Sequence, residues 1–247
     1  MKQEYVLNIN GFEMSVVYDE ETVKEIFIPL LKEWTKLKKE KNKRIIVFLS
    51  APPGVGKTTM AQFMEYLSRI EEGVDEIQAI GLDGFHYHQD YILTHTVFMN
   101  GKTVPMKEVK GCPETFDINK LIQKLNLLKD AEVKWPIYDR NLHDVVEDAV
   151  TVTKDIVLIE GNWLLSTEGP WNDLIKWCDD SVFVNAGDKI LKERLIQRKV
   201  KGGLTREAAE NFYHRSDKVN VNRLLKNHHT ARVNLEMQED GNYIMMN

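Results

Sequence analysis

The stretch SAPPGVGKTT, residues 50–59, lies between an apolar run, Ile45–Leu49, and a segment whose apolar residues have helical spacing. Ala51 to Thr58 fits the relaxed phosphate-loop pattern, in which Ala or Gly is followed by four residues and then by Gly-Lys-Ser/Thr. Ala51 replaces the glycine of the stricter pattern, a change that the chemistry tolerates. A match placed between a strand and an amphipathic helix is difficult to obtain by chance, so the segment indicates a nucleoside triphosphate site.

Each residue type in this loop suits a phosphate ligand. Gly54 and Gly56 allow backbone N–H groups to close around phosphate oxygens, and the positive end of the following helix dipole points at the same anion. Lys57 adds positive charge near the β and γ phosphates, and the Thr58 hydroxyl can bind Mg²⁺. No Asn-Lys-x-Asp motif for guanine is present, so ATP with Mg²⁺ is the expected ligand. The residues expected to bind it are Pro53, Gly54, Val55, Gly56, Lys57, Thr58 and Thr59.

Length and composition favour one cytoplasmic α/β domain with additions. The 247 residues suffice for one full-sized domain, and the 29% charged and 43% hydrophobic residues have the balance of a globular protein. The net charge of −5 gives no overall electrostatic reason to bind nucleic acid or an anionic membrane. Cys112 and Cys178 lack the close Cys/His neighbours of a zinc site, and no signal-peptide core or membrane-spanning apolar run is apparent.

Residues 1–43 are expected to form an appendage before the core. The segment from Tyr5 to Tyr18 contains two short β-type runs around Asn10-Gly11, a dipeptide suited to a tight hairpin turn. Apolar residues at helical spacing follow, and Pro29 should kink or restart that helix. We expect the appendage either to extend the sheet or to provide a contact in a homodimer.

From residue 44 to about 228, strand and helix patterns alternate, which predicts a doubly wound α/β sheet. Its short β-branched runs are typical of strands that are buried on both faces of a parallel sheet. Asp117 and Thr205 are the expected N-caps of two helices. Residues 229–247 form a tail in which a strand pair is expected. The expected core strands and helices cover 45–49, 60–67, 77–82, 118–128, 156–159 and 182–184.

Two acidic residues lie at predicted strand ends, where ligand-facing residues of open α/β sheets are found. Asp83, within GLDGFHYH, could accept the proton of an attacking hydroxyl or could only cap the next turn. Glu160, within IVLIEGNWLL, could hold Mg²⁺ directly or through water, or could only bind neighbouring loops. His86 and His88 form too small a set for a metal site, so substrate contact or packing is the preferred interpretation.

The segment Lys192–Arg206 carries six basic residues and one acidic residue, although the whole chain is acidic. Arg194 and Arg198 are four residues apart and therefore share one helical face, and Gly202-Gly203 supplies a hinge. This pattern predicts a lid near residues 194–206 that closes cations over a transferring phosphoryl group. A basic face that is only solvated is the alternative.

Several motifs occur in a characteristic order: the phosphate loop, DGFHYH from Asp83, PETFD from Pro113, PIYDRNLHD from Pro136, EGNWLL from Glu160 and the Arg-containing lid. Together they resemble the phosphoribulokinase/uridine kinase family, most closely its pantothenate-kinase-like branch, whose members are often labelled fructose-transport or nucleoside kinases. The likeness covers about residues 44–225. It implies a P-loop NTPase fold, a three-layer α/β/α sandwich with a mostly parallel sheet and a helical lid. The N-terminal β-hairpin and helix lie outside the family pattern.

The resemblance also implies roles for individual residues. Asp83 matches the acid that the family uses as general base on the substrate hydroxyl, and Glu160 matches the acid near the magnesium. Tyr138 and His143 match the tyrosine and histidine that uridine kinases place against their nucleoside. The resemblance therefore implies that Asp83, Tyr138 and His143 face the acceptor, whereas Glu160 faces the magnesium.

Two further positions concern the charges in the expected site. Arg194 and Arg198 fall where lid arginines of the family meet the phosphates. Arg140 stands where uridine kinases usually have an aromatic residue, so stacking on a nucleobase is not expected from it. A guanidinium suits a phosphate, a carboxylate or a sugar hydroxyl, and we expect Arg140 and His86 to contact the substrate.

The expected activity is transfer of the γ-phosphoryl group of Mg²⁺-ATP to a hydroxyl of a small metabolite. A sugar, a nucleoside or a pantothenate-like alcohol are all open acceptors, with a sugar or polyol slightly favoured by Arg140. Asp83, Lys57, Arg194 and Arg198 are the expected catalytic residues. A P-loop ATPase that couples hydrolysis to a protein partner, or a nucleotide-dependent regulatory protein without activity, are the alternatives.

Overall fold

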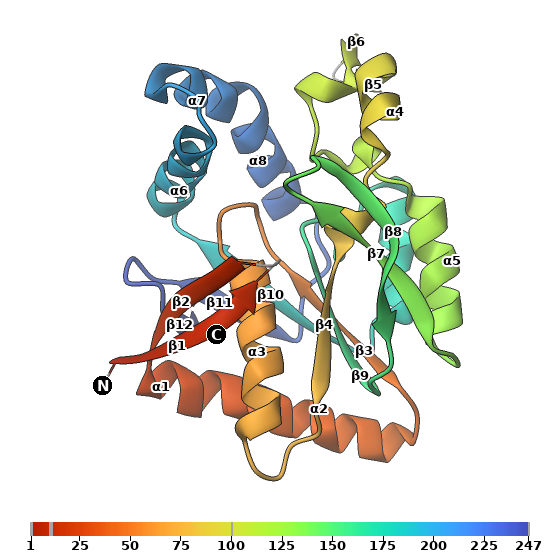
Figure 1. Ribbon diagram of the computed structural model, residues 1–247, viewed down its shortest axis with the longest axis vertical. Helices are drawn as coiled ribbons and strands as arrows, with labels where there is room; N and C mark the ends of the chain where they lie inside the picture. The colour runs from red at the N-terminus through yellow and green to blue at the C-terminus, as the bar shows by residue number, and fades with distance from the viewer. Residues whose placement is uncertain (1, 10–11, 100, 247) are drawn as a thin grey trace.

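A six-stranded sheet runs through the middle of the molecule in this computed structural model, which describes residues 2–9, 12–99 and 101–246 (Figure 1). The strand order is β12-β11-β10-β3-β9-β4, and all neighbours are parallel except the antiparallel pair β11 and β12. The predicted mostly parallel sheet is therefore confirmed. Its strands are β3 (Ile45–Ser50), β4 (Ile77–Gly81), β9 (Ile156–Gly161), β10 (Asp180–Ala186), β11 (Val233–Met237) and β12 (Tyr243–Met245).

Helices cover both faces of the sheet because successive side chains of a strand point to opposite faces. In β3, Ile45 and Val47 lie in one hydrophobic core, whereas Ile46 and Phe48 lie in the other. The first core is closed by α2 (Ile28–Lys41), α3 (Lys57–Ile70) and α6 (Asp188–Lys201). The second core is closed by α5 (Ile118–Leu128) and the 3-10 segment η5 (Gly169–Trp177). The result is the three-layer α/β/α arrangement.

Local sequence signals explain where several helices begin. The Asp117 side chain accepts a hydrogen bond from the backbone N–H of Lys120, and the Thr205 side chain accepts one from that of Ala208, as expected for N-caps. Pro29 lies at the start of α2, directly after the π-helical turn η1 (Val23–Phe27), and the short α1 (Glu20–Thr22) precedes that turn. Phe27 and Ile28 both keep helical dihedral angles, so the helix does not restart at Pro29 but continues past it with a π-helical irregularity just before the proline.

The N-terminal strands β1 (Lys2–Ile9) and β2 (Phe12–Asp19) pair only with each other among the described strands. The Asn10-Gly11 turn lies outside the described residues. Tyr5 of β1 packs its ring edge-on against Phe63 of α3, with the ring centroids 4.7 Å apart. The expectation that the appendage extends the main sheet is therefore wrong, because the hairpin is held by aromatic packing on a helix.

Two groups of elements stand above the carboxyl ends of the parallel strands, on opposite sides (Figure 1). One group continues from α6 with α7 (Arg206–Phe212), the π-helical turn η6 (Tyr213–Asp217) and α8 (Lys218–Lys226). The other group contains α4 (Gln89–Thr94) and the hairpins β5 (Thr96–Met99) with β6 (Lys102–Pro105) and β7 (Val133–Asp139) with β8 (Asp144–Val152). Between them lies the end of β3.

Candidate active site

The phosphate loop connects β3 to α3 at the carboxyl edge of the sheet. Gly54 and Gly56 have φ angles of 92° and 93°, a region that favours glycine, and Gly56 occupies the N-cap position of α3. A cavity of about 720 Å³ opens in front of the loop and is lined by Pro53, Gly54, Gly56, Lys57, Thr58 and Thr59. Val55 is fully buried instead, so it anchors the loop in the core.

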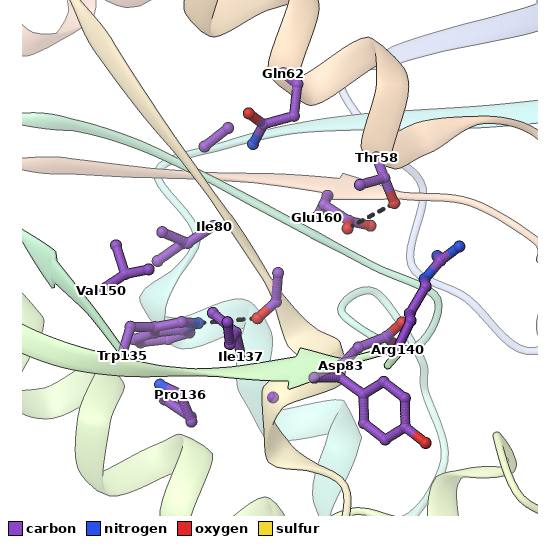
Figure 2. A pocket seen from close by; sticks show the side chains of 14 residues that line it. Thr58, Gln62, Ile80, Asp83, Trp135, Pro136, Ile137, Arg140, Val150 and Glu160 are labelled. Carbon is purple, nitrogen blue, oxygen red and sulfur yellow. Dashed lines mark hydrogen bonds between the residues drawn. The ribbon is translucent and has the colours of Figure 1, made fainter. Parts of the chain in front are cut away.

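Glu160 meets the start of α3 because of the sheet register. It pairs with Leu49 of β3 and with Gly81 of β4, which places its carboxylate between the phosphate loop and the Asp83 segment. The Thr58 hydroxyl donates a hydrogen bond of 2.9 Å to Glu160 Oε1 (Figure 2). Lys57 Nζ lies 3.9 Å from Glu160 Oε2. Burial raises the pKa of Glu160, although Lys57 opposes the shift.

The Thr58 and Glu160 pair fits a magnesium ion. Mg²⁺ prefers oxygen ligands and usually keeps several waters, so one hydroxyl and one carboxylate side by side are a suitable donor set. In the described part of the chain, no group of three or more His, Cys, Asp or Glu residues gathers as the ligands of a metal would. A cation held here would therefore depend on water and on phosphate oxygens for its remaining ligands.

Asp83 follows β4 in the 3-10 turn η2 (Leu82–Phe85) and lines the same cavity as Lys57. Burial tends to raise the pKa of Asp83, but His86, Lys57, Arg140 and Arg198 together hold it below its ordinary value. The carboxylate is therefore ionised at neutral pH, in front of the phosphate loop. Asp83 and Lys57 therefore face the same cavity.

The hairpin β7–β8 presses directly against the Asp83 turn. A Cβ atom placed on Gly84 would lie 2.1 Å from the carbonyl oxygen of Pro136, so only glycine allows this approach. The Trp135 indole N–H donates a hydrogen bond of 2.9 Å to the carbonyl of Gly81, which fixes the same contact (Figure 2). These contacts bring the end of β7, with Tyr138 and Arg140, to the site.

A small pocket of about 150 Å³ opens on the far side of Asp83. Asp83, Arg140 and Thr58 line both this pocket and the larger cavity, so the two spaces meet at these residues. Figure 2 shows Arg140 running alongside Asp83 toward the Thr58–Glu160 pair. Apolar side chains, including Ile80, form much of the remaining wall.

Aromatic packing holds the groups on the far wall of the larger cavity. The His86 ring lies 3.8 Å from the Phe116 ring, and its Nδ1 is 2.9 Å from the backbone oxygen of Asp83. Burial lowers the pKa of His86, so the neutral ring is favoured at neutral pH. The Tyr138 hydroxyl accepts a hydrogen bond of 2.9 Å from Lys110 Nζ. His86 and Tyr138 are thus held by contacts within the protein.

The predicted lid residues lie across the cavity from Asp83. Arg194 Nε donates a hydrogen bond of 2.7 Å to the carbonyl of Gly54, and both Arg194 and Arg198 line the cavity. Lys199 Nζ lies 3.5 Å from the centre of the Phe212 ring and 3.8 Å from Asp217 Oδ2. The basic segment therefore faces the phosphate loop and not only solvent.

Of the predicted substrate residues, His143 is the one that the structure places apart. It lies in the turn between β7 and β8, with a φ angle of 53°, and is not among the described residues that line either cavity. His88 also turns away, because its Nε2 lies 3.2 Å from Glu147 Oε1. The remaining predicted residues either line the cavity or contact a residue that lines it.

The structure adds residues that the motifs alone did not single out. Lys110 and Asn162 line the larger cavity, and Asn162 Oδ1 is buried without a hydrogen-bond partner among the described residues. Asn162 stands in EGNWLL, two residues after Glu160, so the motif itself carried that signal. Lys110 is separated from the PETFD motif by Gly111 and Cys112, and nothing in its immediate sequence indicates a buried position.

The relatives of this chain include kinases. It is 41% identical over 238 residues to the Escherichia coli protein YggC, which carries no functional description, with 96% of this chain and 97% of that protein covered. A Schizosaccharomyces pombe protein provisionally named a uridine kinase is 28% identical over 200 residues, covering 78% of this chain and 83% of the relative. The pantothenate kinase of Enterococcus faecalis is 27% identical, covering 71% of this chain and 61% of the relative. No protein-family model matches the chain.

Two solved structures have a fold similar to that of this chain. A Silicibacter protein provisionally titled a fructose transport system kinase superimposes with a TM-score of 0.69 at 26% identity, covering 83% of this chain and 98% of that chain. The Saccharomyces cerevisiae protein YFH7, provisionally described as a P-loop kinase, superimposes with a TM-score of 0.71 at 15% identity, covering 87% of this chain and 100% of that chain.

Fold, phosphate loop and relatives together define a P-loop kinase, a phosphotransferase that uses a nucleotide. Within that class, the chain belongs to the phosphoribulokinase/uridine kinase family. In the part of the chain that the structure describes, no helix is both long and apolar enough to cross a bilayer.

Proposed function

We propose that this protein transfers the γ-phosphoryl group of Mg²⁺-ATP to a hydroxyl group of a small metabolite. The observation that carries the proposal is that Asp83 and Lys57 line one cavity, with the phosphate loop on one side and a polar pocket wall on the other. A cavity of about 720 Å³ has the size of a typical small-molecule site. Transfer to an alcohol requires a group that accepts the hydroxyl proton, and an ionised carboxylate near the phosphate loop can do so.

The nucleotide half of the site is formed by the phosphate loop and the lid. Backbone N–H groups of the loop and the Lys57 ammonium bind the β and γ phosphates, while Arg194 and Arg198 approach from α6. Thr58 and Glu160 would hold Mg²⁺, and the ion would supply positive charge against the phosphate oxygens. Closing of α6 and α7 excludes water from the phosphoryl group.

On the acceptor side, Asp83 orients the hydroxyl and takes its proton as the phosphoryl group is transferred. Phosphoryl transfer needs little covalent help, so most of the catalysis comes from alignment and from stabilisation of charge by Lys57, Arg194 and Arg198. His86, Tyr138 and Arg140 contact the remainder of the acceptor. The low pKa of Asp83 keeps this base ready at neutral pH.

The Asp83→Asn variant tests this proposal, because the amide keeps the shape of the side chain and removes its basicity. We expect kcat for the acceptor found in an ADP-release screen with Mg²⁺-ATP to fall by about two to four orders of magnitude. Binding of a non-hydrolysable ATP analogue, measured by calorimetry, should change little, because Asp83 lies beyond the phosphate loop.

Phosphorylation of the acceptor is confirmed by ³¹P NMR of the product, which separates transfer from hydrolysis. Unchanged turnover in the Asp83→Asn protein would remove Asp83 from the mechanism. ATP hydrolysis that is independent of every small acceptor would favour an ATPase instead of a kinase.

A further inference from the structure

Two basic residues stand on the cavity wall that faces the lid. Lys110 lies just before the 3-10 turn η4 (Pro113–Thr115), and Arg140 follows β7. Both belong to the group of elements opposite α6 and α7, and both face the space in front of Asp83. Their partners within the protein decide whether their charges are already satisfied.

Lys110 is held in place by neutral groups. Its Nζ donates hydrogen bonds of 2.7 Å to Gln89 Oε1 and 2.9 Å to the Tyr138 hydroxyl. An ammonium carries three N–H donors, so one remains for a ligand. Among the described residues, no carboxylate lies within ion-pair distance of this nitrogen, although Asp144 and Asp83 contribute to its electrostatic environment. A half-buried cation without a counterion is unfavourable in an empty site.

Arg140 has even fewer partners. Within the described ranges it makes no hydrogen bond and no ion pair, which leaves the whole donor fork of its guanidinium available. The charge of Arg140 contributes to lowering the pKa of two carboxylates, Asp83 and Glu160. Glu160 is already engaged by Thr58 and Lys57.

The side chains that line the whole cavity carry more positive than negative charge. Seven lysine and arginine residues line it, against the carboxylates of Asp83 and Asp217, while Glu160 lines the adjoining small pocket. The lid and the phosphate loop supply five of the seven, which suits a triphosphate. Because Mg²⁺ cancels part of the charge of the nucleotide, Mg²⁺-ATP does not account for Lys110 and Arg140 as well.

We propose that the acceptor carries an anionic group, a carboxylate or a phosphate, besides the hydroxyl that receives the phosphoryl group, and that Lys110 and Arg140 bind this anion. The inference rests on the proposed kinase function and names its substrate class. A fork-shaped guanidinium beside a single ammonium donor suits either oxyanion. Neutral sugars and nucleosides would leave both cations without a counterion.

Inorganic phosphate is the first probe, because its binding does not depend on turnover. With the nucleotide half filled by Mg²⁺ and a non-hydrolysable ATP analogue, calorimetry should detect phosphate binding with a Kd of about millimolar order, typical of so small a ligand. We expect Lys110→Met and Arg140→Gln each to weaken this binding about tenfold or more. The control Lys107→Met, an exposed lysine in the neighbouring 3-10 turn η3 (Met106–Glu108), should leave it unchanged.

Matched acceptors then distinguish the two anions. Glycerol, glycerate and glycerol 3-phosphate form one series, and ribose with ribose 5-phosphate and panthenol with pantothenate form two pairs. An anionic member should have the higher kcat/KM, and Lys110→Met should raise its KM while the KM for ATP stays unchanged. The identity of the preferred member tells carboxylate from phosphate.

Absence of phosphate binding, or binding that both variants leave intact, would overturn the inference. Equal or faster phosphorylation of a neutral partner would also overturn it, while leaving the kinase function in place. Conversely, phosphate binding that depends on Lys110 and Arg140 in a protein that phosphorylates no compound would support the anion site and count against the kinase.

Discussion

At the scale of single residues, Gly84 matters to the site because it has no side chain. Its missing side chain lets the backbone of Pro136 and Ile137 lie against the Asp83 turn. Asp83, Tyr138 and the residues that follow β7 therefore share one space because of this single close approach. Side-chain chemistry at the site depends on backbone packing one residue away from the proposed base.

The Gly84→Ala variant tests this dependence. Its Cβ would meet backbone atoms of Pro136 at 2.1 and 2.4 Å, so β7 or the turn must move. We expect the free energy of unfolding to fall by about 1–3 kcal/mol, as for other overpacked sites. A shift of the turn by about 1 Å would also lower kcat by about a hundredfold.

Urea denaturation and steady-state kinetics measure the two effects. Gly202→Ala is the control for stability, since its Cβ would approach no heavy atom closer than 3.4 Å. A Gly84→Ala protein with the stability and kcat of the parent would show that the hairpin does not position Asp83.

Much at this scale could be predicted from the sequence, and the reason is chemical. Gly56, Lys57 and Thr58 have fixed spacing because a triphosphate imposes it, and Asp83 and Glu160 follow predicted strands. Lys110 could not be predicted, because its position depends on hydrogen bonds to residues 21 and 28 positions away. The roles that we propose for all these residues in catalysis and binding remain predictions.

At the scale of elements, an ion-pair cluster ties the base of the lid to the acceptor side. Arg223 of α8 donates hydrogen bonds of 2.7 and 3.0 Å to Glu114 and one of 2.6 Å to Glu168. Glu114 belongs to the PETFD motif, whose Asp117 caps α5. The motif therefore holds elements together, and the sequence alone did not reveal that its glutamate pairs with an arginine 109 positions later.

The Arg223→Met variant should destabilise the fold in a pH-dependent way. At pH 7 we expect a loss of about 1–3 kcal/mol, less than for a fully buried pair because these side chains are partly exposed. Burial tends to raise the pKa of Glu114, but hydrogen bonds from Arg223, Cys112 and the backbone, together with the charge of Arg223, lower it. The contribution of the pair is thus present above the ordinary pKa of glutamate and is lost as the pH falls through the lowered value.

Urea unfolding of the parent and the variant at neutral pH and near pH 4 measures the difference. The gap in stability should narrow at the acidic pH. Lys226→Met, an exposed change on the same helix, should have little effect at either pH. A gap that is the same at both pH values would mean that Arg223 acts through packing and not through its charge.

The hairpins also show where prediction of elements failed. β7 and β8 were not predicted, because Pro136 falls at a register irregularity within β7 and half of β8 is exposed. A proline interrupts the pattern of an ordinary strand, yet an irregular position tolerates it. By contrast, β3 and β9 were predicted correctly, because strands buried on both faces are apolar at almost every position.

At the scale of the whole molecule, the two ends of the described chain meet behind the phosphate loop. Tyr18 of β2 and Tyr243 of β12 pack together with their ring centroids 6.1 Å apart, and Asn242 is hydrogen-bonded to Asp19 in both directions, at 2.6 and 2.7 Å. A Cβ atom placed on Gly56 would lie 3.9 Å from the Tyr243 hydroxyl and 3.3 Å from Arg194 Nη2. Burial raises the pKa of Tyr243 to about 12, so the hydroxyl stays protonated.

Removal of one hydroxyl tests this contact. In Tyr243→Phe, the buried Tyr18 side chain loses a neighbouring hydroxyl group, and we expect a loss of stability of about 1–3 kcal/mol. The KM for ATP should rise as well, because Gly56 and Arg194 lose their support. Tyr91→Phe, at a partly exposed tyrosine of α4, is the matched control. Parent-like stability and KM in Tyr243→Phe would show that the tyrosine pair is only packing.

The position of Tyr243 has a consequence for biosynthesis. The phosphate loop is made early, yet the hydroxyl group behind it is supplied almost two hundred residues later. During translation, the phosphate loop is therefore made before the Tyr243 side chain that packs behind it. We expect a nascent chain that stops before β12 to bind ATP less tightly. We therefore expect the chain to reach its full affinity for the nucleotide only once β12 has left the ribosome.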